Sequence, residues 1–379
     1  MSSEENNMRD QVLSKPQLLR EVLPGFEQRV RELLDHDRCR SIQRIFVVGC
    51  GDSYNAALAA GLALERLAWI PSEPMTSLQF ARYAVPFLPR QAARNSLVLG
   101  ISVSGEVART IEAVSLARQQ GALTVAVTGT PSSRIARAAG KVLNLEIPPF
   151  PHAPGVRSYM ASLVGLYLLA IYLGEVKALY SEDEAKSLRN ELLAAADIME
   201  ATIEAIDWPT AQLAQEAEDE DNFVFVGAGP NYGTSLFSAA KVIEAAGRHA
   251  MGQDTEEWSH LQYFVRETAA PTFLISPPGL GHSRAVELVP VMRRIGRRVV
   301  VVIQEGDQAI ADQADAVLTV KGPMREEFTP LVYCTAGELF AAHLSAVLGE
   351  PYFRGFAGPW SPEDGGNTIR TSAILTELP

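Results

Sequence analysis

An internal repeat of a glycine-containing segment constrains the fold more than any other feature of this chain. Residues 45–54 read IFVVGCGDSY and residues 223–232 read FVFVGAGPNY, so two glycines and a tyrosine recur in the same positions. A second matching pair follows, LVLGISVSG at 97–105 and TFLISPPG at 272–279. A unit that occurs twice in one chain predicts two structural halves of similar architecture.

Each half alternates short β-branched segments with helical stretches, which is typical of βαβ units and a parallel sheet. The fold class predicted is α/β, with two tandem doubly wound, flavodoxin-like domains. Their boundaries are expected at 41–181 and 208–347. A helical segment at 1–40 precedes them, and a linking helix without Gly or Pro at 182–207 joins them. A tail rich in Gly and Pro follows at 348–379.

Charge and composition exclude several classes of protein. Lys and Arg number 33 against 45 Asp and Glu, a net charge of −12, so the basic surface of a nucleic-acid-binding protein is not expected. The three cysteines form no CxxC pattern and the histidines have no ligand spacing, so we expect neither disulfides nor a metal. The uncharged run 158–174 is shorter than a membrane span of about 20 residues and predicts a buried helix. With its polar N-terminus, the chain is expected in the cytoplasm, without a membrane partner.

The first glycine turn could belong to a dinucleotide-binding fold. Gly49 and Gly51 match the start of GxGxxG, but Tyr54 stands where that pattern needs a third small residue for helix–strand packing. The turn nevertheless places Ser53 at a helix N-terminus, where backbone N–H groups can hold an anion.

The second turn gives the clearer signal. Ser102, Ser104 and Gly105 lie between an apolar segment and a helical stretch, so hydroxyl and N–H groups could wrap a phosphate there. The alternative is that Ser104 only caps the helix. The second half reads SPPG at 276–279 and lacks the second hydroxyl, which assigns the phosphate site to the first half.

The SxSGE turn, the GxGxSY turn and the tandem repeat together resemble the SIS (sugar isomerase) phosphosugar-binding domains. The pair resembles the isomerase half of glucosamine-6-phosphate synthases and the related deaminases and fructosamine-6-phosphate deglycases. The resemblance implies that phosphate is bound by Ser53, Ser102, Ser104 and Gly105, and that Gly51 lies at the sugar. Two valines replace the Gln and Thr of the family's second turn, so Thr110 is expected to supply the missing hydroxyl.

A Lys-x-x-Glu pair marks a helix in the second half. Lys241 and Glu244 lie one turn apart, which alone indicates no more than an ion pair. The resemblance implies that Glu244 moves a proton between C1 and C2 of the sugar, beside Lys241. It also matches Glu257 and His260 to the family's Glu-x-x-His segment, whose histidine assists ring opening. The alternative for His260 is a structural role within its own domain.

Two further segments match family positions that contact the sugar. Val156 and Ser158 lie in a GVRSY segment that resembles the family's GVAST turn and could also cap the helix that follows. Arg370 falls where the family tail has a lysine. Because a guanidinium does not give up its proton near neutrality, Arg370 could hold a substrate oxygen but not form a Schiff base.

These residues imply a cofactor-independent enzyme that acts on an amino- or fructosamine-6-phosphate, as a deaminase or a deglycase. Glutamine-dependent synthesis is not expected, since only about 40 residues precede the first predicted strand. Plain aldose–ketose isomerisation and a non-catalytic phosphosugar sensor remain alternatives, and turnover would separate them. The resemblance also implies a homodimer in which His260 completes the active site of the neighbouring subunit.

Overall fold

The computed structural model describes residues 6–363 and 368–377 and divides into two compact units. Unit 1 comprises the chain up to Leu18, Phe150–Arg157 and Ala194–Gly355, and unit 2 comprises Leu19–Pro149, Ser158–Leu193 and the chain from Phe356. The expected segments are contiguous, whereas both units are assembled from separate stretches, so the boundaries listed above stay predictions. Residues 1–5 of the expected helical segment, and 364–367 and 378–379 of the tail, lie outside the described residues.

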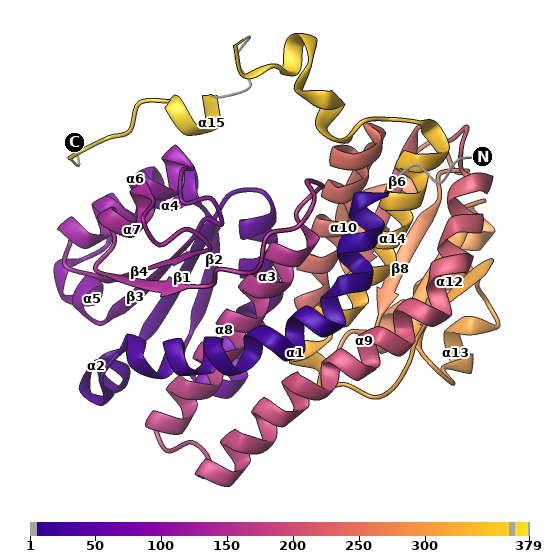
Figure 1. Cartoon of the computed structure of the whole chain (residues 1–379). Helices are drawn as coiled ribbons and strands as arrows, with labels where there is room; N and C mark the ends of the chain where they lie inside the picture. The colour runs from indigo at the N-terminus through magenta and orange to yellow at the C-terminus, as the bar shows by residue number, and fades with distance from the viewer. Residues whose placement is uncertain (1–5, 364–367, 378–379) are drawn as a thin grey trace. The chain divides into compact units, whose positions relative to one another are not determined.

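Unit 2 contains a five-stranded sheet in the order β2-β1-β3-β4-β5, with every pair of neighbours parallel (Figure 1). The three strands expected from the β-branched segments are confirmed and lie at the centre. The two edge strands were not expected, because their residues are largely half-buried or exposed and lack an apolar run. The bounds are β1 (Arg44–Gly49), β2 (Ser72–Thr76), β3 (Ser96–Ile101), β4 (Leu123–Thr128) and β5 (Lys141–Asn144).

Unit 1 contains a second five-stranded parallel sheet, in the order β10-β9-β8-β6-β7. Counted along the chain within each sheet, the strands of both follow the order 2-1-3-4-5, which is the flavodoxin-like order. The expected α/β class with parallel sheets is therefore confirmed, and the equal orders support the tandem interpretation. The bounds are β6 (Asn222–Gly227), β7 (His249–Asp254), β8 (Thr272–Ser276), β9 (Val299–Gln304) and β10 (Ala316–Val320).

Helices make up most of the remaining structure. The α-helices are α1 (Asn7–Leu33), α2 (His36–Ser41), α3 (Asp52–Ala68), α4 (Ser77–Tyr83), α5 (Arg90–Arg94), α6 (Ala108–Gln119), α7 (Arg134–Ala138), α8 (Val156–Val176), α9 (Glu182–Glu216), α10 (Pro230–Ala246), α11 (Thr255–His260), α12 (His282–Arg294), α13 (Gln308–Ala311), α14 (Pro330–Leu348) and α15 (Thr368–Thr371). Short 3₁₀ turns are η1 (Val85–Phe87), η2 (Gln262–Phe264), η3 (Glu326–Phe328), η4 (Tyr352–Phe356) and η5 (Gly358–Trp360).

Apolar side chains from the sheets and their covering helices form the cores. In unit 2, Phe46 and Val98 of the sheet pack against α4, α5 and α6. In unit 1, one face of the sheet packs against α11, α12 and α13. Aromatic rings cover the other face, where Phe273 stacks on Phe225 at 4.7 Å and contacts Phe340 of α14 at 4.6 Å. With both faces buried, the central strands read as continuous apolar runs, as the sequence shows.

Within residues 6–363 and 368–377, two helices are long and apolar enough to cross a membrane by length and composition, Val156–Val176 and the stretch Glu326–Leu348. In the most apolar 18-residue stretch of each helix, 94% of the first and 78% of the second is buried within the protein. The prediction of a buried helix at 158–174 is thus confirmed. The expected linking helix also forms, but α9 continues past residue 207, through Pro209, to Glu216.

Candidate functional site

Glycines at the end of β1 shape the first turn of the candidate site. A Cβ on Gly49 would lie 2.6 Å from the carbonyl carbon of Ser53, so only glycine lets α3 start this close to the strand. Gly51 then adopts φ +55° at the N-terminal cap of the helix. These two backbone requirements place Ser53, which is half-buried, in the first turn of α3 at the carboxyl edge of the sheet.

The turn after β3 holds a buried hydroxyl that lacks a partner. Ser102 is 1% exposed, and its Oγ forms no hydrogen bond with the described residues. The Val103 carbonyl accepts hydrogen bonds from residues 128–130 of the next turn, which fixes the path of the loop. Ser104 Oγ accepts a bond from the Glu106 N–H at 3.4 Å. Because a buried hydroxyl without a partner is unfavourable by about 1–3 kcal/mol, Ser102 is suited to a ligand oxygen.

Ser133, which the sequence motifs did not indicate, is a second hydroxyl at this turn. It is 4% exposed, and its Oγ also has no partner among the described residues. A Cβ on Gly105 would overlap Ser133 Oγ, and Gly105 has φ +68°, so glycine is required there twice over. The available signal was its place in the turn after the third apolar segment, since Ser102 lies in the turn after the second.

Glu106 and Thr110 of the same region have partners of their own. The Glu106 carboxylate accepts the Arg134 backbone N–H at 3.0 Å and its Nε at 2.6 Å, and the hydrogen bond from that N–H lowers the pKa of Glu106. Thr110 is fully buried, and its hydroxyl lies 3.0 Å from Ser77 Oγ. Thr110 therefore packs beneath the turn, and its predicted contact with phosphate stays a prediction.

A carboxylate occupies the counterpart of this turn in unit 1. Glu326 accepts the Leu280 N–H at 3.0 Å, and a Cβ on Gly279 would overlap the Glu326 side chain. Ser276, the counterpart of Ser102, has its hydroxyl bonded to His282 Nδ1 at 3.2 Å. The cavity beside these residues has a volume of only about 10 Å³. The assignment of the phosphate site to the first half stays a prediction.

Lys241 and Glu244 form an ion pair on α10 that differs from an ordinary surface pair. The Lys241 side chain is fully buried, its Nζ bonds Glu244 Oε2, and it lies 4.9 Å from the centre of the Phe237 ring. The Glu244 carboxylate remains 29% exposed. Lys241 therefore fixes the orientation of a carboxylate that solvent or a substrate can still reach.

Glu257 and His260 lie on the short helix α11, and both are exposed. The Asp254 carboxylate caps this helix by accepting the N–H groups of Glu256 and Glu257. His260 is 65% exposed in its side chain, and its Nε2 lies 3.1 Å from Glu256 Oε1. A hydrogen bond from Arg284 lowers the pKa of Glu256. His260 is thus not packed in the core beside the buried Trp258 but contacts Glu256 on the same helix, and its role stays a prediction.

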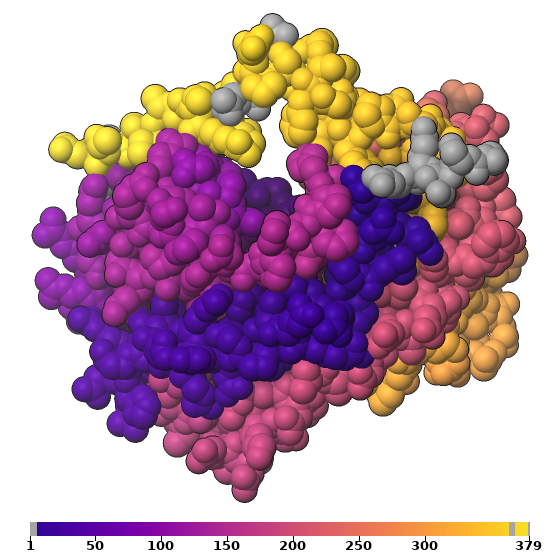
Figure 2. Space-filling model, viewed as in Figure 1, coloured from indigo at the N-terminus to yellow at the C-terminus, as the bar shows by residue number. Residues whose placement is uncertain are grey.

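The remaining predicted residues lie at a helix start and in the tail. Val156 is buried, Ser158 is half-buried, and both belong to the first turn of α8. Arg370 is exposed on α15, and its carbonyl accepts a bond from Arg134 Nη2 at 2.6 Å. Figure 2 shows the tail against the surface of unit 2, where Gln119 of α6 donates to the Thr376 carbonyl at 2.7 Å.

Each unit gathers its own part of the predicted set. Unit 2 brings together the turns that contain Ser53 and Ser102–Gly105 at the carboxyl ends of adjacent strands. Unit 1 pairs Lys241 with Glu244 and carries Glu257 and His260 on another helix. Residues 6–363 and 368–377 contain no group of three or more His, Cys, Asp or Glu side chains that could hold a metal ion.

Comparison with families of known sequence and structure places this geometry in context. Residues 39–172 match the SIS domain. The chain is 30% identical to a glutamine–fructose-6-phosphate aminotransferase (isomerizing) of Streptomyces coelicolor over 314 residues, 82% of this chain and 50% of that protein. It is 28% identical to the Corynebacterium diphtheriae enzyme of the same name over 90% of this chain and 55% of the relative. The chain thus spans about half the length of the curated relatives it matches.

Solved structures with the same fold cover nearly the whole chain. The C-terminal domain of glucosamine-fructose-6-phosphate aminotransferase from Francisella tularensis superposes with a TM-score of 0.81 at 16% identity, covering 92% of this chain and 98% of that one. Glucosamine-6-phosphate deaminase from Thermotoga maritima gives a TM-score of 0.67 at 18% identity, covering 90% and 94%. These likenesses establish a shared fold over both units.

Proposed function

The chain carries a SIS domain and is homologous to the isomerase part of the aminotransferases. We propose that it is an enzyme that acts on an amino- or fructosamine-6-phosphate. The observation that carries this proposal is the buried, unpartnered Ser102 hydroxyl in the SxSGE turn at the end of β3. A phosphate there would accept hydrogen bonds from the Ser102 and Ser104 hydroxyls and from backbone N–H groups of the turn that precedes the helix. Ser53 would bind from the adjacent turn, and Ser133 is the additional candidate.

Glu244 is the proposed base for the proton transfer between C1 and C2. With a fructosamine phosphate, removal of a C1 proton and delivery of a proton to C2 converts the ketosamine into an imine at C1. Water then hydrolyses the imine to the aldose phosphate and the free amine. With an aminosugar phosphate, the proton moves from C2 to C1, and hydrolysis of the imine at C2 releases ammonia. Lys241 holds the Glu244 carboxylate in place for either direction.

Arg370 favours hydrolysis over amine transfer through a lysine. A guanidinium at this position can bind a substrate oxygen or carboxylate but cannot form a Schiff base. The proton transfer and the hydrolysis of the imine consume only the substrate and water, so the proposed reaction requires no cofactor. Plain aldose–ketose isomerisation uses the same proton transfer and differs only in lacking the C–N cleavage.

The proposed assembly is a cytoplasmic homodimer with shared active sites, in which His260 assists ring opening in the partner's site. The exposure of the His260 ring supports this role, because a histidine that served its own core would be buried.

A substrate panel tests the proposed function. The full chain is incubated with glucosamine-6-phosphate, fructose-6-phosphate, and α- and ε-linked fructosamine-6-phosphates, and ammonia, free amino acid and glucose-6-phosphate are measured. We expect release of ammonia or of an amino acid from one of the amine-bearing substrates. Interconversion of the hexose phosphates alone would favour the isomerase, and binding without any turnover would favour a phosphosugar sensor.

A further inference from the structure

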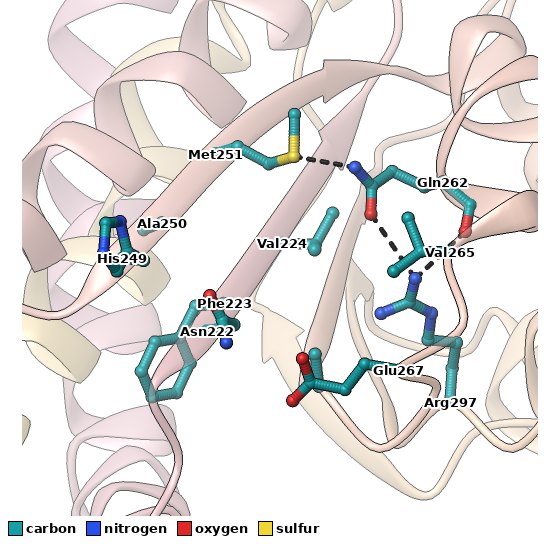
Figure 3. A pocket seen from close by; sticks show the side chains of 11 residues that line it. Asn222, Phe223, Val224, His249, Ala250, Met251, Gln262, Val265, Glu267 and Arg297 are labelled. Carbon is teal, nitrogen blue, oxygen red and sulfur yellow. Dashed lines mark hydrogen bonds between the residues drawn. The ribbon is translucent and has the colours of Figure 1, made fainter.

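A pocket at the amino ends of the strands in unit 1 lies apart from every turn considered so far. Its volume is about 310 Å³, and its walls include the first residues of β6 and β7 and the segments that lead into β8 and β9 (Figure 3). The turns at Ser276 and Leu280 lie at the opposite, carboxyl edge of the same sheet. The pocket therefore needs an explanation that the proposed function does not provide.

Arg297 is the unusual residue of this pocket. It is 3% exposed, its Nε has no hydrogen-bond partner, and it forms no ion pair with any carboxylate in the described part of the chain. Its Nη2 donates to the Gln262 carbonyl at 3.0 Å and to Gln262 Oε1 at 3.4 Å. Burial lowers the pKa of Arg297. A guanidinium stays protonated even so, and a buried charge without an ion-pair partner is strongly unfavourable.

Glu267 supplies a negative charge to the same pocket; its charge acts on Arg297 and opposes the lowering of the Arg297 pKa by burial, but the two side chains form no ion pair. In Figure 3 its carboxylate points toward Asn222 and away from the guanidinium. Glu267 is exposed and forms no ion pair within the described residues, so its carboxylate can take a partner from solution. The pocket thus presents a cation and an anion that form no ion pair with each other, at separate points of its wall.

The rest of the lining is largely apolar. Phe223, Val224 and Val265 line it, with Ala250 on the neighbouring edge strand (Figure 3). Such a wall suits a compact organic body rather than a bare inorganic ion. Glu267 also disfavours a doubly charged phosphate, because like charges repel.

We propose that this pocket binds a small zwitterion of the amino-acid type. The planar guanidinium of Arg297 receives the carboxylate, since its donors match a carboxylate in geometry and charge. Glu267 receives the ammonium group, and the apolar wall receives the side chain. The site is separate from the phosphosugar turns, so its occupancy does not depend on the proposed function.

Calorimetric titration of the full chain with the twenty common L-amino acids tests the site, with inorganic phosphate as a comparison. At least one amino acid should bind saturably, and its methyl ester and N-acetyl forms should each bind about tenfold more weakly or worse. Arg297→Gln should abolish this binding, and Glu267→Gln should weaken it about tenfold. Glu204→Gln, at an exposed carboxylate on α9, is the matched control and should bind normally.

Ala250→Leu keeps both charges and fills the pocket, so it should also abolish binding; it keeps the test valid if Arg297→Gln fails to fold. The proposal is overturned if no amino acid binds, if Ala250→Leu or Glu267→Gln binds as the wild type does, or if phosphate binds more tightly than any amino acid. None of these measurements involves turnover, so failure of this site and failure of the proposed function are distinguishable.

Discussion

The Glu326 carboxylate accepts the Leu280 backbone N–H at 3.0 Å, at the place in unit 1 that corresponds to the Ser102 turn in unit 2. In one unit the turn at the end of the third strand in chain order already holds a protein carboxylate. In the other it presents a buried hydroxyl without a partner. Two turns of common architecture therefore differ in whether an anion from solution can enter.

The first prediction concerns this difference. Ser102→Ala and Ser104→Ala should each weaken binding of a phosphosugar by about 1.5–3 kcal/mol, because each removes a hydrogen bond to a charged oxygen. Binding of the unphosphorylated sugar should change far less. Ser276→Ala, at the matching position of unit 1, is the control and should leave both affinities unchanged. Calorimetry that finds equal weakening of the two ligands would reject the phosphate site.

Glu244→Gln should keep the shape of the side chain while removing the proton acceptor. Turnover of the substrate identified by the panel should fall by about 10²–10⁴, the usual loss on removal of a general base. Phosphosugar binding should persist, and Glu204→Gln should retain full activity. Near-normal turnover by Glu244→Gln would mean that Glu244 serves only as the partner of Lys241.

Mixing two inactive variants tests the shared sites. Glu244→Gln and His260→Ala homodimers should each be inactive. After subunit exchange in equal amounts, mixed dimers contain one intact site and should restore about a quarter of wild-type activity. A monomer in sedimentation, or no recovery after exchange has been demonstrated by mass spectrometry, would contradict the model.

Gly105→Ala should destabilise the protein by more than the 1–2 kcal/mol that a left-handed conformation costs a residue with a Cβ. The additional loss arises because the new methyl group overlaps Ser133 Oγ. Adding Ser133→Ala should recover that part. Gly25→Ala is a control in which the added methyl group should stabilise the protein, because no atom lies within 4 Å of the Cβ position of Gly25 on α1. Its free energy of unfolding, measured in urea, should rise by about 0.5–1 kcal/mol.

Glu112 should make stability depend on pH through the docked tail. Its carboxylate is fully buried, and this burial by itself raises the pKa of Glu112. Hydrogen bonds from Arg82 and from the Leu375 N–H, together with the charge of Arg109, outweigh burial, so the net effect is a lowered pKa. A lowered pKa contributes stability that is complete above the ordinary glutamate value and is lost as the pH falls through the folded-state value.

Glu112→Gln should therefore unfold at lower urea concentration near pH 7, and its difference from the wild type should shrink as the pH falls below about 4. Hydrogen exchange in residues 368–377 should increase in the variant, because Leu375 loses a charged acceptor. A difference from the wild type that is constant across this pH range would contradict the assignment.

Central strands and helices were predictable from sequence because each carries its signal locally. The apolar runs before Gly49, Ser102 and Gly227 identify strands whose two faces are buried. The edge strand β2 was not predictable, because it pairs on one side only and its residues need not be apolar. The same limit applies to the edge strands β5 and β7.

The chain sequence by itself determined the repeat, the parallel α/β class and the positions of the two strand-ending turns, since these depend on residues close together in the chain. The tertiary structure decided which groups meet across the fold. It set Ser133 against Gly105, placed Glu326 in the turn of unit 1, and buried Arg297 with its Nε unpartnered. A local pattern fixes backbone conformation, but whether a buried polar group finds a partner depends on segments that only folding brings together.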